Sequence, residues 1–258
     1  MSIDFRHLIS LSTTPLKFKI LEKLKNPTGI SSLARSLNVP RDTIKPHIRS
    51  FIKAGLIEKC DEGYKLTVLG KTVLEKAVEI EKILSIPEDV REFFRTHDLS
   101  CIPENLIKDI HKLYGGYLIQ TVDPFEISED WVRILEVSRW IKGVSPVYHP
   151  KFPSLFVTLA EKRDVTLVLT EDVFEKCMSE YPELVRKYIE LDGEMRVCSD
   201  AKVAFVVAEK GFAMGLYAGN VYDANHVYVC TSDDVVCWGL KLFNHFYSKS
   251  TVVKITHR

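Results

Sequence analysis

Apolar residues recur at helical spacing in three short segments near the start of the chain. Residues 16–24 place four apolar side chains on one stripe, and residues 31–37 predict a second, shorter helix. The Asn-Val-Pro run at 38–40 ends that helix, because proline cannot continue it and asparagine tolerates a left-handed cap. A third helix is predicted to begin at Arg41. Its buried side is expected to consist of Ile44, Ile48, Phe51 and Ile52.

Two alternating segments follow the third helix and predict a β-hairpin. Residues 56–60 and 64–68 flank an Asp-Glu-Gly turn at 61–63. Three helices with a tight turn before the third, followed by a short hairpin, are typical of a winged helix-turn-helix, which holds its third helix in the DNA major groove. The side chains expected to contact DNA are Arg41, Thr43, Lys45, His47 and Arg49 on the third helix and Lys59, Tyr64 and Lys65 on the hairpin.

Charge is distributed unevenly along the chain. Residues 1–75 contain 13 Lys and Arg against 7 Asp and Glu, whereas the remaining residues contain 22 against 28. The overall charge of zero therefore combines a basic N-terminal part with an acidic remainder, which suits the approach of one end to a polyanion. Double-stranded DNA is the predicted partner of a domain over residues 1–68. Two alternatives remain: a helical domain whose basic residues are only a solvated face, and a winged helix that binds protein.

A long amphipathic helix is predicted directly after the hairpin, over residues 69–84. Such a stripe commonly forms a two-fold dimer seam, because one winged helix reads only a few base pairs. The alternative is that the stripe covers its own domain. A second amphipathic segment follows at 90–94 and a further helix is predicted over 104–114. Residues 69–115 are therefore predicted to link the two domains and to form the dimer. The apolar stripe consists of Leu69, Val73, Ala77, Ile80 and Leu84.

Residues 116–258 have the pattern of strands and helices that is typical of an α/β domain. The apolar run at 165–169 is typical of a strand buried in a mixed sheet, and the chain is predicted to close with a helix over 233–247. The predicted fold class is therefore a two-domain α+β or α/β protein. Further strands are expected at 117–121, 195–198, 203–208, 212–217 and 227–230, and further helices at 129–141, 154–162 and 171–189.

This second half resembles the phospholipase-D-like fold, whose enzymes carry His-x-Lys followed after four residues by Asp. Residues 200–207 are taken as the corresponding strand, and there Lys202 matches the family's lysine. Asp200 replaces the nucleophilic histidine and Val207 replaces the acid, while the one literal His-x-Lys, at 149–151, also lacks the following Asp. The resemblance implies a noncatalytic relative, since such a phosphodiesterase has no covalent step without its histidine.

A second resemblance rests on short segments spread along the chain: 96–103 (THDLSCIP), 140–150 (WIKGVSPVYHP), Asp200, Lys202, 220–223 (NVYD), 232–234 (SDD) and 237–243 (CWGLKLF). With these segments, nearly the whole chain is similar to archaeal regulators in which a winged helix precedes a FilR-type, methanogenesis-regulatory middle domain. The resemblance implies a transcription factor whose C-terminal domain senses a ligand or assembles the dimer.

Three places in the C-terminal half are candidate ligand sites. In the phospholipase-D-like fold the former active-site cleft lies beside the lysine-bearing strand, so Lys202 is expected either to hold a small anionic effector or to pair with Asp200. A Ser-Pro-x-x-His-Pro turn at 145–150 is the second place. Ser232 is the third, although serine directly before a helix is more often an N-cap. The candidate ligand-binding residues are Asp200, Lys202, Ser145, Tyr148, His149 and Ser232.

Other sequence features narrow the functional class. Six cysteines are scattered without a C-x-x-C pair or a histidine at zinc spacing, so neither a metal nor a cofactor is expected. No apolar run approaches the roughly 20 residues that span a bilayer, and the N-terminus does not resemble a signal peptide, so a cytoplasmic location is expected. The sequence predicts a homodimeric, sequence-specific DNA-binding regulator without enzymatic activity. The alternative is a phosphodiesterase or nuclease tethered to DNA.

Overall fold

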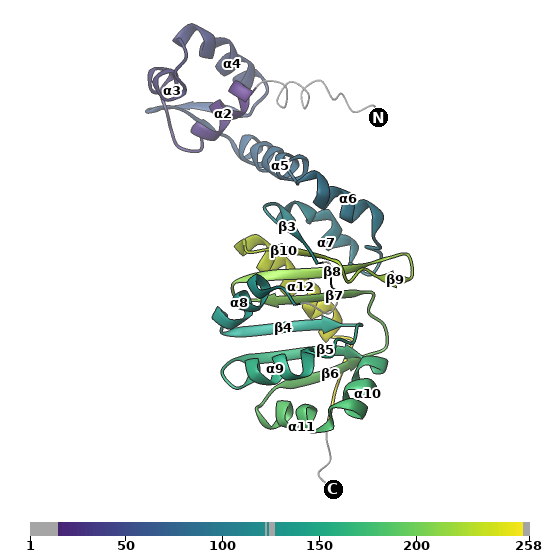
Figure 1. Ribbon diagram of the computed structural model, residues 1–258. Helices are drawn as coiled ribbons and strands as arrows, with labels where there is room; N and C mark the ends of the chain where they lie inside the picture. The colour runs from purple at the N-terminus through teal and green to yellow at the C-terminus, as the bar shows by residue number, and fades with distance from the viewer. Residues whose placement is uncertain (1–14, 122, 124–126, 255–258) are drawn as a thin grey trace. The chain divides into compact units, whose positions relative to one another are not determined.

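The computed structural model describes residues 15–121, 123 and 127–254, and the chain divides into two compact units (Figure 1). The first unit ends at Leu84 and the second begins at Ser85. Each unit has hydrophobic core clusters composed of its own residues. The helices that the sequence grouped over 69–115 are thereby divided, the long one falling in the first unit and the shorter ones in the second.

Three helices and an antiparallel hairpin open the first unit, and a longer helix closes it. Its elements are α2 (Pro15–Lys23), α3 (Ile30–Leu37), α4 (Arg41–Lys53), β1 (Ile57–Cys60), β2 (Gly63–Leu66) and α5 (Val68–Leu84). Asn38 ends α3 in the left-handed conformation, with φ of 52°, as the Asn-Val-Pro turn predicted. In the hairpin Ile57 lies opposite Leu66 and Cys60 lies opposite Gly63.

The core of the first unit draws side chains from every helix and from the hairpin. Ile20, Leu33, Ile44 and Leu74 are almost completely buried, and each such side chain contributes about 1.5–3 kcal/mol to folding. Ile52 was expected on the buried side of α4 and is 46% exposed instead. Each step of four residues turns about 40° beyond a full helical turn, so this stripe drifts away from the core and Phe51 takes the inward position.

The second unit is built on a mixed sheet, in which the described residues form nine strands in the order β11-β6-β5-β4-β7-β8-β10-β3, with β9 paired to β8. The central strands β4, β5 and β6 are parallel and the other pairings are antiparallel. The elements are α6 (Glu88–Thr96), α7 (Glu104–Lys108), the 3₁₀ turn η1 (Ile110–Leu113), β3 (Tyr117–Gln120), α8 (Glu129–Val137), β4 (Trp140–Ser145), α9 (Phe152–Ala160), β5 (Asp164–Thr170), α10 (Glu171–Glu180), α11 (Pro182–Glu190), β6 (Glu194–Cys198), β7 (Val203–Ala208), β8 (Gly211–Ala218), β9 (Val221–Tyr222), β10 (His226–Cys230), α12 (Asp233–Tyr247) and β11 (Thr251–Val252).

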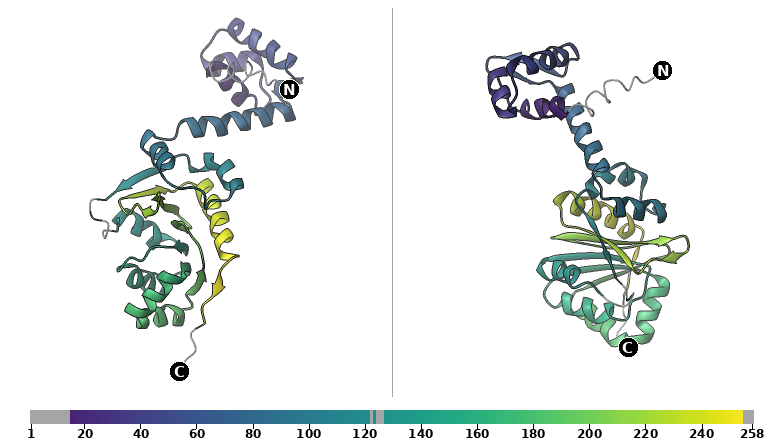
Figure 2. Two further views of the ribbon diagram at one scale, coloured as in Figure 1. Left: turned by 90° about the vertical axis from the view of Figure 1, so that its right-hand side faces the viewer. Right: turned by 45° about the horizontal axis from the view of Figure 1, so that its top comes forward.

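Helices cover both faces of this sheet (Figure 2). The α12 helix packs on one face together with α6 and α7, whereas α8 to α11 lie over the other face. On β7 and β8 the side chains directed toward α12 are large, among them Phe205, Phe212 and Met214. The alternating positions carry smaller residues such as Ala204 and Ala213. The side chains of β7 and β8 are therefore large on the face toward α12 and smaller on the opposite face.

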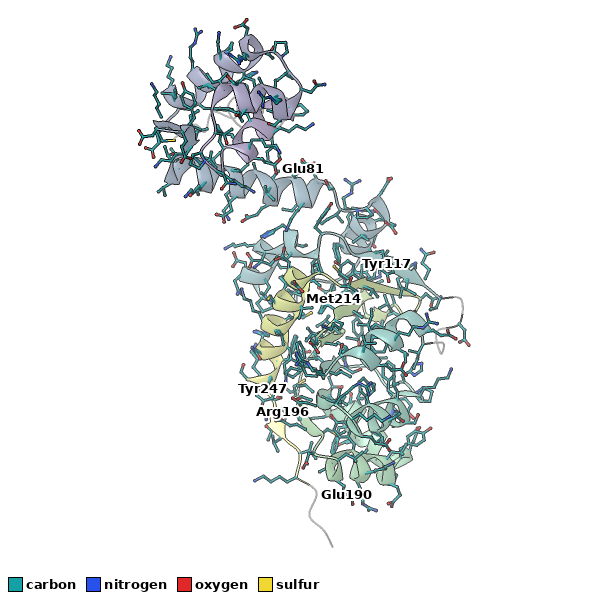
Figure 3. All side chains as sticks on the ribbon, turned by 90° about the vertical axis from the view of Figure 1, so that its left-hand side faces the viewer. Glu81, Tyr117, Glu190, Arg196, Met214 and Tyr247 are labelled. Atoms are coloured by element: carbon teal, nitrogen blue, oxygen red, sulfur yellow. The ribbon has the colours of Figure 1, made fainter. Side chains whose placement is uncertain are left out.

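Polar contacts fix α12 to its neighbours in addition to burial. The indole Nε1–H of Trp238 donates a 2.9 Å hydrogen bond to the carbonyl oxygen of Leu106 in α7. At the other end of α12 the Arg196 guanidinium lies 4.1 Å from the centre of the Tyr247 ring, and both are labelled in Figure 3. A buried indole N–H without a hydrogen-bond partner is energetically costly, so the Trp238–Leu106 hydrogen bond also fixes the position of α7 against α12.

Three predicted helices differ from the structure. The helix predicted over 104–114 is α-helical only to Lys108, and after Asp109 the chain continues as the 3₁₀ turn η1. The helix predicted over 129–141 ends at Val137, and Trp140 begins the strand β4, which lies between β5 and β7. The helix predicted over 171–189 is divided into α10 and α11 at Tyr181, because Pro182 cannot donate the hydrogen bond that a continuous helix requires. Lys202 also lies just before β7 rather than within it.

A histidine–carboxylate cluster ties the end of α6 to the loop between β9 and β10. The Asp223 carboxylate accepts hydrogen bonds from His97 Nε2 at 3.0 Å and from His226 Nδ1 at 2.7 Å. Burial by itself raises the pKa of Asp223, but hydrogen bonds from the Asn225 N–H and from the two imidazoles outweigh it, so its pKa lies below the ordinary value. The ionised carboxylate therefore stabilises the second unit.

Replacing Asp223 with Asn should lower the free energy of unfolding of the second unit by about 1–3 kcal/mol at neutral pH. A lowered folded pKa means that this contribution is present above the unfolded value of about 3.9 and is lost as pH falls through the lower folded value. The gap between variant and parent should therefore close below about pH 4. Urea unfolding followed by tryptophan fluorescence measures it, because Trp131, Trp140 and Trp238 all lie in the second unit. The exposed Asp164, changed to Asn, is the control, and equal losses in both variants would contradict the prediction.

Candidate functional site

The α4 helix of the first unit presents a basic side away from the core. Three buried apolar residues fix its inward side, so helical periodicity turns the opposite side outward. Arg49 is exposed near the middle of that outward side, and Lys53, one turn further along, extends it. Lys53 was not among the predicted DNA contacts, although its spacing of four residues from Arg49 was a visible signal.

The start of α4 carries the other predicted contacts. Arg41 and Thr43 are exposed. Lys45 is also exposed, and its Nζ lies 2.8 Å from the carboxylate of Asp42 one turn earlier. That carboxylate offsets part of the lysine charge, so Lys45 contributes less to the positive potential of α4 than Arg49 does.

His47 differs from its neighbours because its side chain is half-buried. Burial lowers the pKa of His47, and the nearby charge of Lys17 lowers it further. The imidazole is therefore predominantly neutral at pH 7 and provides hydrogen-bonding atoms rather than a positive charge.

The hairpin places its two predicted lysines on opposite faces. Lys59 pairs across the strands with Tyr64, whereas Lys65 pairs with Glu58, and adjacent pairs in a ladder project to opposite sides. Lys65 Nζ lies 3.2 Å from the Glu58 carboxylate. Tyr64 packs partly against the core and its backbone bonds to Thr28, so this residue also fixes the hairpin to the loop before α3. The two lysines therefore do not form a single basic surface.

The first predicted ligand site is a polar hollow of about 300 Å³ in the second unit, at the start of β7. Asp200 and Lys202 line it together, but the structure has no ion pair between these two described residues. Glu171 and Asp172, in the first turn of α10, line the same hollow. Three carboxylates against one lysine disfavour an anionic ligand here.

The second predicted site, the turn after β4, is largely occupied by contacts within the protein. Ser145 Oγ donates a 2.7 Å hydrogen bond to the Val147 carbonyl oxygen. The Tyr148 hydroxyl donates to the Glu180 carboxylate, and His149 Nδ1 accepts from the Lys151 N–H at 3.2 Å. These hydrogen bonds within the protein therefore fix the conformation of the turn.

The side chains of this turn line one end of a larger, apolar cavity. Its volume is about 340 Å³, and it lies between the sheet and helices α8 to α11. Aromatic side chains contribute much of the wall, including Trp131, Phe152 and Phe156. Sequence reasoning named the turn residues but missed the cavity, whose signal was the run of small residues alternating along 204–215.

The third predicted site, Ser232, is the N-cap of α12. Its Oγ accepts a 3.2 Å hydrogen bond from the Val235 N–H, as the N-cap interpretation of the sequence expected. The Cys230 Sγ lies 3.5 Å from the same oxygen. The Ser232 hydroxyl is therefore already engaged in capping α12.

Histidine, cysteine and carboxylate side chains are the residues that bear on metal binding and thiol chemistry. They contain no group of three or more His, Cys, Asp or Glu side chains arranged to hold a metal ion. Burial raises the pKa of the Cys101 and Cys177 thiols to about 11, which keeps both protonated and poorly nucleophilic at neutral pH. Within the described ranges, no helix has the length and apolarity that crossing a membrane requires.

Comparison with family models identifies the family of the chain through two FilR1 domains, described as parts of a methanogenesis regulatory protein. The model of the FilR1 N-terminal domain matches residues 5–87, and the model of the FilR1 middle domain matches residues 124–249. The chain belongs to this FilR1 family. A curated relative, methanogenesis regulatory protein FilR1 of Methanothrix harundinacea (strain 6Ac), is 27% identical over 93% of this chain. The match covers 56% of the relative, so this chain spans about half of its length.

Two solved structures are similar at low scores. TrmBL2, an archaeal chromatin protein with a novel mode of DNA binding, is 12% identical, with a TM-score of 0.44 over 97% of this chain and 100% of its own. Nuc of Salmonella typhimurium, a phospholipase D family member, is 10% identical, with a TM-score of 0.41 over 55% of this chain and 99% of its own. At TM-scores below 0.5 neither structure assigns a fold to this chain.

Replacing Ser232 with Ala should lower the free energy of unfolding of the second unit by about 1 kcal/mol, because the Val235 N–H loses its acceptor. Ser232→Asn should retain most of the stability, since asparagine also caps helices well. Urea unfolding followed by tryptophan fluorescence compares the three proteins. If the alanine variant unfolds like the parent, the serine hydroxyl has no structural role as a cap.

Proposed function

We propose that the protein is a sequence-specific DNA-binding transcriptional regulator whose first unit is a winged helix-turn-helix. In this proposal α4 is the recognition helix, and β1 and β2 form the wing. The observation that carries the proposal is the outward side of α4, where Arg49 and Lys53 are exposed. Both lie within residues 1–75, which contain 13 basic and 7 acidic residues. Membership of a family named for regulatory proteins supports the same function.

The contacts are proposed to divide between bases and backbone. Arg41, Thr43, Lys45 and Arg49 face the major groove, where a bidentate arginine distinguishes guanine. His47 adds hydrogen bonds without charge, for the reason given by its lowered pKa. On the hairpin, Lys59 and Lys65 are proposed to meet phosphates on different strands of the duplex or at different depths, since they project from opposite faces.

The second unit is proposed to be a noncatalytic, phospholipase-D-like sensing domain of a cytoplasmic regulator. Val207 is completely buried toward α12, so it offers nothing to the hollow that Asp200 and Lys202 line. No histidine is among the described residues that line that hollow. A covalent phosphodiesterase mechanism needs such a nucleophile. Metal-free hydrolysis of a generic phosphodiester that disappears in Lys202→Met would favour the alternative, a DNA-tethered nuclease.

A homodimer is proposed to form along α5. Leu69 and Leu84 are more than half exposed, and Ile80 is 39% exposed. Val73, by contrast, packs against the core of the first unit, so only part of the predicted stripe is open to a partner. Two-fold pairing along the open part doubles the DNA sequence that one winged helix reads.

Arg49→Ala should weaken binding to the operator by roughly 5- to 150-fold, which corresponds to about 1–3 kcal/mol for a base-edge contact. Lys65→Ala should weaken binding to all sequences about equally and reduce the salt dependence, since a phosphate contact carries no sequence information. Genome-wide footprinting supplies the operator, and fluorescence anisotropy at several salt concentrations measures both effects. Arg186→Ala in the second unit is the control. Unchanged operator affinity in a folded Arg49→Ala protein would refute the recognition-helix assignment.

Replacing both Ile80 and Leu84 with Glu should convert the dimer to a monomer, because like charges would meet across a two-fold seam. Sedimentation velocity measures the change. Lys71→Glu alone changes the net charge by the same two units on the polar side of α5 and should leave the dimer intact. A folded Ile80→Glu/Leu84→Glu protein that remains dimeric would move the seam away from α5.

A further inference from the structure

We infer that the second unit binds an uncharged, largely apolar small molecule in the cavity between the sheet and helices α8 to α11. At about 340 Å³, the cavity lies within the range of small-molecule sites, roughly 300–1,000 Å³. Protein interiors otherwise leave few voids larger than one water molecule. An apolar cavity of roughly 150 Å³ holds benzene, so this one admits a ligand of roughly twice that size.

The floor of the cavity is formed by small residues that neighbour one another across the strands. Gly215 lies opposite Ala204, and Ala213 lies opposite Val206, on the paired strands β7 and β8. Gly143 of β4 lies on the other side of Val206. The alternating positions of these strands carry the large side chains that pack on α12. The hollow is thus a consequence of the sequence on one face of the sheet, while the opposite face is filled.

The lining defines the chemistry of the ligand. No Asp, Glu, Lys or Arg is among the described residues that line the cavity, so an ionised ligand would be buried there without a counter-charge. The hydroxyls of Ser145, Tyr148 and Tyr188 already bond within the protein. The hydroxyls of Ser128 and Tyr222 have no hydrogen-bond partner among the described residues. The ligand is therefore apolar over most of its surface and carries one or two neutral hydrogen-bonding groups.

A neutral, apolar ligand differs from the small anionic effector that the sequence predicted. Lys202 suggested an anion, but the hollow around it carries three carboxylates and is separate from the apolar cavity. The inference deepens the proposed regulator, and rests on it only for the consequence that the bound molecule is an effector. Binding itself is measured without DNA, so failure to bind ligand and failure to bind DNA are independent results.

The test uses the full chain and two naphthalene probes that differ in charge. Naphthylamine is uncharged at neutral pH, and its fluorescence should rise and shift to the blue on binding to one site per chain. Naphthalenesulfonate should bind at least tenfold more weakly, because the described lining of the cavity offers no Lys or Arg to it. Ala204→Leu, which fills the floor, should weaken naphthylamine binding at least tenfold. Ala218→Leu, at an exposed position of β8 outside the cavity, should bind like the parent.

Circular dichroism and thermal unfolding establish that each variant is folded. If Ala204→Leu does not fold, Val206→Leu, which adds a single methylene to the same floor, takes its place and should weaken binding in the same direction. Three results would overturn the inference: no binding of naphthylamine by the parent, equal binding by a folded filling variant, or tighter binding of the sulfonate that is lost in Lys202→Met. The last result would place an anionic effector in the polar hollow.

Discussion

The alternation of large and small side chains along β7 and β8 is the constraint on which the second unit depends. A strand directs successive side chains to opposite faces, so one stretch of sequence determines the side chains on both faces of the sheet. Toward α12 the large residues build a closed core that includes Phe212 and Trp238 in edge-to-face contact, 5.6 Å between ring centres. Toward α8 to α11 the small residues leave a cavity. One face thus provides stability, which permits the other to remain hollow.

The first unit was largely predictable because its contacts are local in sequence. The stripe of α2, the Asn38 cap and the hairpin register each follow from spacings of a few residues. The error there is one of angle, because Ile52 lies beyond the edge of the buried side of α4 and is exposed. Predicting it would have required the positions of the neighbouring helices, which no local pattern contains.

The second unit was predicted less completely because its central pairings join distant segments. The strand β4 was mistaken for the end of a helix, since the apolar spacing of α8 continues into Trp140 and Ile141. It is recognisable as a strand only by its partners, β5 and the much later β7. The cavity was missed for a related reason. Small residues at 204 and 215 are visible in the sequence, but that they neighbour one another depends on the register of the sheet.

Electrostatics separates the roles of the two units. The basic excess lies within residues 1–75, and the remainder of the chain carries 28 acidic against 22 basic residues. A polyanion is therefore attracted more strongly to the first unit than to the second, in agreement with the DNA contacts proposed on α4 and the hairpin. The same acidic excess opposes the approach of a small anion, and the carboxylates around Lys202 oppose it locally. A neutral ligand meets neither barrier, and the cavity suits such a ligand because its described lining holds no Asp, Glu, Lys or Arg.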